Sequence, residues 1–253
     1  MKRLTYISLA IICLSMLAAQ PVTAQTGIGK LQVKARVGYS IGATAPIGIP
    51  ATIRSIESFR LTPNFMVGAD VMYPLSEKFG LQAALHYEIK DMDGEVTTKG
   101  YHIKVRMDED ELEGLYTGHV WQKVRQRMLT IPLQMTCELS QKVQLKAGPY
   151  LSLLLCKDFY GIASDGYLRK DDPTGPKILM GAKEGEWATY EFDDDMRNFQ
   201  FGISVGADFQ VYKNLGLSAD LNWGLTGVFP GDFKTVEQTL YPVYGTLGIF
   251  YRF

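Results

Sequence analysis

Hydrophobic and polar residues alternate along most of the chain with a period of two, the pattern of a β-strand with two different faces. The clearest case is residues 199–211, where Phe, Ile, Val and Ala occupy the odd positions and Gln, Gly, Ser and Asp the even ones. The other segments are 31–41, 65–73, 81–89, 129–137, 143–153, 215–225 and 243–253. Each is close to the 9–11 residues that a tilted membrane strand needs. The pattern predicts eight antiparallel strands.

Long and short connections alternate between these segments. The long ones are 42–60, 91–126, 157–197 and 228–241, and the tight turns lie around 76–78, 140–142 and 213–214. Outer-membrane barrels have long external loops, short periplasmic turns and both termini inside, so the alternation favours that class. Pro and Gly clusters predict irregular loops over 42–60 and 158–197. Residues 101–107 alternate again, and we expect them to extend a hairpin above the membrane.

One face of the predicted strands is apolar, and the other is rich in Gly, Ser, Thr and Gln with charges of both signs. Small residues suit the narrow lumen of an eight-stranded barrel, which side chains fill. The charged lumen candidates are Lys34, Arg36, Lys146, Arg252, Asp70, Glu88, Glu138, Asp208 and Asp220. In a dry lumen these ions must pair, because an unpaired buried ion costs several kcal/mol. A soluble barrel would instead place the apolar face inside.

Aromatic residues gather near the predicted strand ends. They are Tyr73, Phe79, Phe199, Tyr241, Tyr251 and Phe253. Such residues form the interfacial girdles of membrane barrels, although the general preference of aromatic residues for strands gives the same pattern.

The N-terminus has the pattern of a cleaved secretory signal. Lys2 and Arg3 precede an apolar run, and small residues up to Ala24 offer a cleavage site. We therefore predict a signal peptide over 1–24 and one barrel domain over 25–253. A membrane anchor is the alternative. A lipoprotein signal at Cys13 is disfavoured because Ile12 stands where a small residue is needed.

Composition narrows the choice less than the pattern does. The 253 residues carry a formal charge of −1, which becomes −3 without Lys2 and Arg3, so the basic footprint of a nucleic-acid-binding protein is missing. Three cysteines cannot form a disulfide scaffold. The mean hydropathy of −0.03 does not separate a soluble β-protein from a membrane barrel, because alternating strands average to neutrality.

The last strand alternates up to a terminal Phe253, and this end resembles the signature that outer-membrane barrels present to the barrel-assembly machinery. Residues 129–133, 145–150, 201–207 and 223–225 resemble the PorT-like porin family of small outer-membrane β-barrels, the outer membrane protein beta-barrel domain. The resemblance implies an all-β, eight-stranded antiparallel transmembrane barrel of the OmpA/OmpX-like up-and-down type, with long extracellular loops, in the bacterial outer membrane. One branch of the family is tied to type IX secretion, and no motif here singles out that branch.

No residue set points to catalysis, a cofactor or a metal. His86, His102 and His119 lack close metal-ligand spacing. His86 shares the predicted lumen face with Glu88, where a hydrogen bond is favoured over an acid–base pair. The acidic runs 108–111, with Glu113, and 193–195 could bind calcium or bridge lipopolysaccharide, but a solvated loop is the favoured interpretation.

The functional prediction is a non-enzymatic outer-membrane barrel whose loops give an envelope-structural or surface-interaction role. The alternative is a narrow porin or a type IX secretion accessory component, and an outer-membrane enzyme is less favoured. Expected partners are outer-membrane lipid and lipopolysaccharide, and the barrel-assembly machinery through Phe253. We expect a monomer with no nucleic acid and no cofactor.

Overall fold

The computed structural model describes residues 31–60, 62–107, 110–170, 173–233 and 238–253. The described residues form twelve β-strands: β1 (Gln32–Pro46), β2 (Ile53–Arg60), β3 (Phe65–Pro74), β4 (Phe79–Ile89), β5 (Met92–Met107), β6 (Asp110–Ser140), β7 (Val143–Lys170), β8 (Lys177–Met180), β9 (Ala188–Glu191), β10 (Phe199–Tyr212), β11 (Leu215–Gly224) and β12 (Leu240–Arg252). The predicted signal peptide, 1–24, lies outside the described residues. No helix among the described residues is long and apolar enough to cross a membrane.

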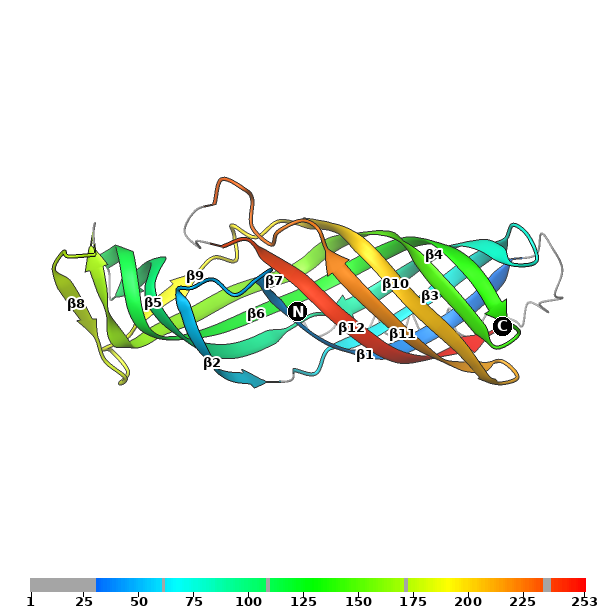
Figure 1. Cartoon of the computed structure of the whole chain (residues 1–253), viewed down its shortest axis with the longest axis horizontal. Coiled ribbons are helices and arrows are strands. Elements are labelled where there is room, and N and C mark those ends of the chain that lie inside the picture. The colour runs from blue at the N-terminus through cyan, green and yellow to red at the C-terminus, as the bar shows by residue number, and fades with distance from the viewer. Residues whose placement is uncertain (1–30, 61, 108–109, 171–172, 234–237) are drawn as a thin grey trace, which may run out of the picture.

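Antiparallel pairing closes the sheet on itself (Figure 1). The pairings run from β1 to β3, β4, β6, β7, β10, β11 and β12, and β12 pairs back with β1. We call these strands the closed circuit. Strand β2 pairs with β5, β5 pairs with β6, and β8 and β9 pair with β7. The expectation of eight strands in all is therefore wrong, because β2, β8, β9 and the first part of β5 lie in segments that were expected to be loops.

Two strands run far beyond the rest of the circuit. Strand β6 has 31 residues and β7 has 28, and together with the four additional strands they build a second, projecting part of the molecule (Figure 1). We call the described residues of 42–60, 91–126, 157–197 and 228–241 the extension. The three tight turns and the C-terminus lie at the opposite end, the short-turn end.

The prediction that 42–60 and 158–197 are irregular is wrong for most of their length. The hairpin expected through 101–107 is confirmed, since β5 pairs with β6 as far as Met107 and Asp110. Strand β7 continues past residue 158, and a local irregularity hides this in the sequence. Arg127 pairs with Cys156 and Met128 with Leu154, so Leu155 is an extra residue that inverts the alternation of β7.

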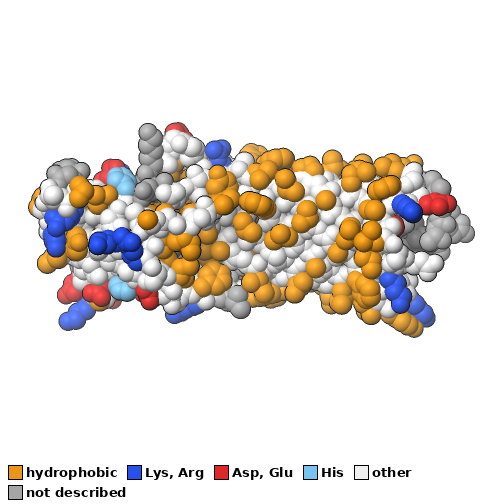
Figure 2. Space-filling model, viewed as in Figure 1, with side chains coloured by type: hydrophobic (Ala, Val, Ile, Leu, Met, Phe, Trp, Pro, Cys, Tyr) orange, Lys and Arg blue, Asp and Glu red, His pale blue; other side chains and the backbone are white. Residues whose placement is uncertain are grey.

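The predicted faces are confirmed. Along β10, Phe199, Phe201, Ile203 and Val205 are 43–58% exposed, while Gln200 and Ser204 are buried. Outward apolar side chains cover the closed circuit on the face seen in Figure 2, and every strand of the circuit contributes exposed apolar residues, which together form an outer band. The inward residues of the same strands are mainly polar or small.

The molecule has two interiors of opposite character. Inside the closed circuit the buried residues include Lys34, Arg36, Asp70 and Asp208. The largest buried apolar cluster instead lies mostly in the extension, with Val124, Phe159 and Phe192 among its members. The extension is thus a packed structure with its own core, and the closed circuit encloses a charged lumen.

Candidate functional site

The charged lumen residues of six strands meet at one level of the barrel. Lys34 and Arg36 come from β1, Asp70 from β3, His86 from β4, Lys146 from β7, Asp208 from β10 and Asp220 from β11. Side chains along a strand point alternately to its two faces, and these residues are on the inward face of their strands. Each strand therefore directs its charged side chain into the lumen. The network contains three cationic and three carboxylate side chains together with His86, so its formal charges balance.

Arg36 is the centre of this network. Its guanidinium contacts Asp70 at 2.6 Å, Asp208 at 3.0 Å and Asp220 at 3.0 Å. Arg36 and Asp208 lie 172 residues apart on strands that do not pair with each other, so this contact crosses the lumen. A planar guanidinium with five donors is suited to binding several carboxylates at once.

Asp208 is the second centre. Besides Arg36 it accepts hydrogen bonds from Lys34 at 2.8 Å and from Lys146 at 2.9 Å. Its side chain is 1% exposed, and those of Lys34 and Arg36 are fully buried. Lys146 also contacts Asp220 at 2.8 Å.

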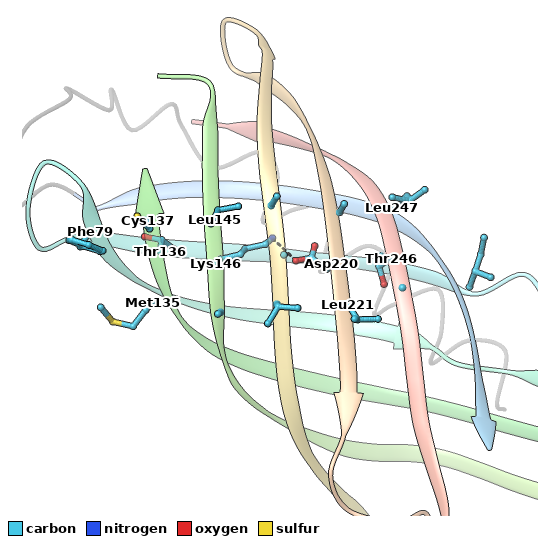
Figure 3. Close-up of a pocket in the computed structure, with 17 residues that line it drawn as sticks. Phe79, Met135, Thr136, Cys137, Leu145, Lys146, Asp220, Leu221, Thr246 and Leu247 are labelled. Carbon is cyan, nitrogen blue, oxygen red and sulfur yellow. Dashed lines mark ion pairs between the residues drawn. The ribbon is translucent and has the colours of Figure 1, made fainter. Parts of the chain in front are cut away.

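A glycine makes room for that last contact. Figure 3 shows Lys146 of β7 reaching Asp220 of β11 across the intervening strand β10. Gly206 is the residue of β10 that pairs with both. A Cβ atom at position 206 would collide with the Asp220 carboxylate and lie 2.8 Å from Cε of Lys146. The lumen-facing glycines therefore create space for long side chains.

A second ion pair lies nearer the extension. Lys90 contacts Glu88 at 2.8 Å, and Glu88 accepts a hydrogen bond of 2.6 Å from the hydroxyl of Thr130. The Lys90 ammonium lies 5.6 Å from the ring centroids of both Tyr150 and Tyr244. These rings and charges fill the lumen between the Arg36 network and the extension.

Little space remains inside the circuit. The cavity between the two charge clusters, bounded by Met66, His86, Glu88 and Asn222 among others, has a volume of about 10 Å³. A single buried water needs about 10–15 Å³. The lumen is therefore packed, with no room for a continuous column of water at this level.

The extension contains a larger pocket, which we call the β2 pocket, with a volume of about 200 Å³. It lies beneath β2, among the ends of β1 and β12 and the neighbouring parts of β5, β6 and β9. Its apolar lining residues are Ala43, Ala45, Pro46, Ile49, Ile53, Ile56, Phe59, Met92, Val96, Ile103, Val120, Phe159, Phe192 and Leu240. Glu95 is the one charged residue of its lining.

The pocket exists because the end of β1 that enters the extension has lost its neighbour β3 and has gained no other partner on that side among the described strands. Strand β3 begins at Phe65, which pairs with Tyr39 of β1, so residues 42–46 of β1 pair only with β12 among the described pairings. Strand β2 follows β1 in the chain, but it pairs with β5. The described pairings join no residue of β1 to β2, which leaves a gap in the hydrogen-bonded wall.

The edge of this gap that faces the closed circuit is the segment just before β3, and it is held mainly by side-chain hydrogen bonds. The side-chain amide of Asn64 donates to the Asp91 carbonyl at 2.9 Å, and the Asp91 amide donates to Oδ1 of Asn64 at 2.8 Å. The hydroxyl of Thr62 donates to the same carbonyl at 2.6 Å. Ser40 N also donates to Asn64 O at 2.8 Å. The segment from Thr62 to Asn64 is thus held to both β1 and the residue just before β5.

Aromatic rings form the far wall of the pocket. The Phe159 ring lies 4.8 Å from Phe229 and 6.2 Å from Phe192, and Tyr190 stacks on Phe192 at 5.4 Å. Burial raises the pKa of the Tyr190 phenol further above its ordinary value, which already leaves the group neutral at physiological pH. The wall is therefore uncharged and rigidly packed.

A wide groove of about 880 Å³ lies on the outside of the closed circuit (Figure 3). Its outward lining alternates large residues such as Leu145, Leu221 and Leu247 with small residues such as Ala207 and Gly245. It belongs to the apolar outer band, and we assign it no ligand.

The structure brings six of the nine predicted lumen charges into the Arg36 network. Glu88 lies in the second cluster, while Glu138 accepts a hydrogen bond from Gln144 at 2.5 Å nearer the short-turn end. Arg252 of β12 pairs with Lys34 in the register of β1 and β12. His86 forms the expected lumenal hydrogen bond, but its partner is Asp70, at 2.7 Å, rather than Glu88.

The acidic runs lie in the extension. Residues 108 and 109 are outside the described residues, while Glu111 pairs with Lys104 at 2.7 Å and His102 lies 3.4 Å from Glu113. Among the described residues, no group of three His, Cys, Asp or Glu side chains is placed to hold a metal ion. The β2 pocket was not predicted from the sequence, because its residues lie in segments that were expected to be long connections between strands.

A packed polar lumen inside an apolar outer band defines a membrane β-barrel, and comparison with known families agrees. The family model described as "Outer membrane protein beta-barrel domain" matches residues 18–230. The chain belongs to this family and is a bacterial outer-membrane protein. The match does not test the narrower PorT-like resemblance, which stays a prediction. No curated protein sequence matches the chain.

Solved structures of outer-membrane proteins are similar to the chain in fold alone. Ail, the attachment invasion locus protein of Yersinia pestis, has 10% identity and a TM-score of 0.38 over 90% of this chain and 100% of its own. CarO of Acinetobacter baumannii has 12% identity and a TM-score of 0.39 over 88% and 97%. The outer membrane protease OmpT of Escherichia coli has 12% identity and a TM-score of 0.30 over 89% and 94%.

Proposed function

We propose that this protein is a sealed, non-enzymatic barrel of eight membrane-spanning strands, which holds the extension at the cell surface for interaction with other molecules. The eight strands are those of the closed circuit. The observation that supports this proposal most strongly is the difference in chemistry between the interior of the closed circuit and the interior of the extension. Ion pairs cross and fill the lumen, whereas the extension has its own apolar core and pocket.

The proposed orientation places the extension outside the cell and the short-turn end in the periplasm, the usual arrangement of bacterial barrels. Phe253 then lies on the periplasmic side, where its ring packs 5.1 Å from Tyr251 and its amide donates to Val33 O at 2.9 Å. We propose that this end is what the barrel-assembly machinery recognises. The outward apolar band contacts outer-membrane lipid, and the base of the extension lies among lipopolysaccharide. A monomer suffices for this arrangement because the circuit closes within one chain.

The test of the sealed lumen is conductance in a planar bilayer. The purified wild-type protein is expected to give no discrete channel steps, because the Arg36 network blocks the lumen. A variant that combines Arg36→Ala with Asp208→Ala empties the centre and should raise the ion leak, while Asp232→Ala, at an exposed site of the extension, should not. Discrete channels from the wild-type protein would overturn the proposal in favour of a narrow porin.

The non-enzymatic part has its own test. Glu95 and His119 lie 3.9 Å apart in the extension, each partly exposed. Purified protein is expected to turn over neither lipid nor peptide. Turnover that is lost in Glu95→Gln would contradict this part of the proposal and favour an enzyme.

A further inference from the structure

We propose that the β2 pocket binds one uncharged hydrophobic small molecule, which enters from the side through the gap between β1 and β2. This inference rests on the proposed surface role of the extension and names the class of ligand that the extension takes. Three features support it: the volume and apolar lining of the pocket, the neutral character of nearly all its polar groups, and the exposed apolar rim.

The volume and lining of the pocket set the class of ligand. An apolar cavity of about 150 Å³ accommodates benzene, so about 200 Å³ suits one or two aromatic rings or a short aliphatic chain. Aliphatic side chains from β1, β2 and β5 face the aromatic wall formed by Phe159, Tyr190 and Phe192. Such walls with few polar groups are typical of small-molecule sites.

Polar groups in the lining do not call for a charged ligand. The hydroxyl of Thr98 donates to Gly118 O at 3.2 Å, and that of Thr44 lies 3.4 Å from the hydroxyl of Tyr244. Both are therefore engaged within the protein. The Glu95 carboxylate would repel an anion. The other polar lining residues are neutral, and most of the lining is apolar, so an ionised ligand would lose hydration against it; these neutral residues are Ser58, Tyr101, Gln122, Tyr190 and Gln238. An uncharged molecule avoids both costs.

The entrance is marked by apolar side chains that remain exposed outside the main outer band. Ile49, Ile56 and Phe59 line the pocket and are still 65%, 59% and 46% exposed. Hydrophobic side chains also gather over β2, beyond the band of the closed circuit (Figure 2). Contiguous exposed apolar surface of this kind marks binding grooves in soluble regions of proteins. A hydrophobic molecule that meets this rim reaches the pocket without crossing a polar surface.

The experiment uses the full chain in lipid nanodiscs and fluoronaphthalene as the probe, followed by fluorine NMR. Empty nanodiscs measure partition into lipid. The wild-type protein is expected to add one saturable binding site. Val96→Phe, which fills the pocket from β5, should weaken that binding by about tenfold or more. An absence of saturable binding above empty nanodiscs, or equal binding by Val96→Phe, would overturn the inference.

A matched pair of rim variants keeps the test independent of folding. Ile49→Asp introduces a charge at the mouth and should weaken binding by about fivefold, because the ligand must then pass an ionised group. Ile47→Asp is the control: it changes an isoleucine of the same loop that is 60% exposed and does not line the pocket. It should leave binding within about twofold, as should Leu179→Phe on β8. Equal losses in Ile49→Asp and Ile47→Asp would contradict the proposed entrance.

Failure of this inference is distinguishable from failure of the proposed function. If the wild-type barrel conducts but the probe binds with the expected variant pattern, the sealed lumen is wrong and the site stands. If the barrel is silent and the probe does not bind, the site alone is wrong.

Discussion

At the scale of residues, the lumen shows what a sequence can and cannot specify. The alternation of polar and apolar positions identified Lys34, Arg36 and Asp208 as inward side chains, and the structure confirms their burial. It could not identify which charges meet. Arg36 and Asp208 belong to strands separated by two others in the circuit, so their contact depends on barrel diameter and stagger, which no local pattern encodes.

Asp208 gives the sharpest prediction at this scale. Asp208→Asn removes the negative charge that faces Lys34, Arg36 and Lys146, and we expect a loss of stability of about 3–5 kcal/mol, the usual cost of breaking a buried ion pair. Urea titration of the protein in phospholipid vesicles measures this loss.

The control for this substitution is Asp232→Asn, at an exposed position of the extension, which should change stability by less than about 0.5 kcal/mol. If Asp208→Asn unfolds as the wild type does, the network does not contribute in the way that its distances indicate.

At the scale of elements, the extension is the largest feature that the alternation along the sequence did not predict. Strands β6 and β7 run from the closed circuit into the extension without a break. On the extension side of Thr130, however, the inward face of β6 changes from mainly polar to mainly apolar, and Leu155 inverts the alternation of β7. A search for steady alternation stops at both changes. The signal was present on β6, where Tyr116, Val120 and Val124 keep the same parity as the lumen residues Thr130 and Gln134.

Phe159 is the residue that tests whether the extension is a folded unit. It is 1% exposed and contacts the rings of Tyr190, Phe192 and Phe229, so Phe159→Ala should cost about 3–5 kcal/mol. Because the ring lies in the extension, we expect the cost to appear as local opening there. Hydrogen exchange of the Phe192 and Val228 amides should accelerate, since both are bonded within this region.

Exchange along β10 and β11 should stay unchanged in this variant. Leu179→Ala, at a side chain that is 72% exposed, is the matched control and should leave the extension protected. Acceleration that spreads equally into β10 would show that the extension and the closed circuit open as one unit, against this account.

At the scale of the whole molecule, the chain combines a membrane barrel with a folded projection. Apolar residues face outward in the closed circuit and inward in the extension, which is the inversion expected where a chain leaves lipid for water. The mean hydropathy of −0.03 carries no trace of this inversion, because it does not depend on which way a side chain faces. Composition alone could not separate them, whereas the position of each apolar residue does.

The most direct test of the central claim is surface labelling of single cysteines in whole cells. In a background with Cys13→Ser, Cys137→Ser and Cys156→Ser, Leu179→Cys places a thiol on the exposed face of β8 in the extension, and Gln141→Cys places one in a tight turn at the short-turn end. A membrane-impermeant maleimide should label Leu179→Cys on intact cells and Gln141→Cys only after the outer membrane is permeabilised. Labelling of Gln141→Cys on intact cells, with Leu179→Cys protected, would contradict a barrel that holds its extension at the cell surface.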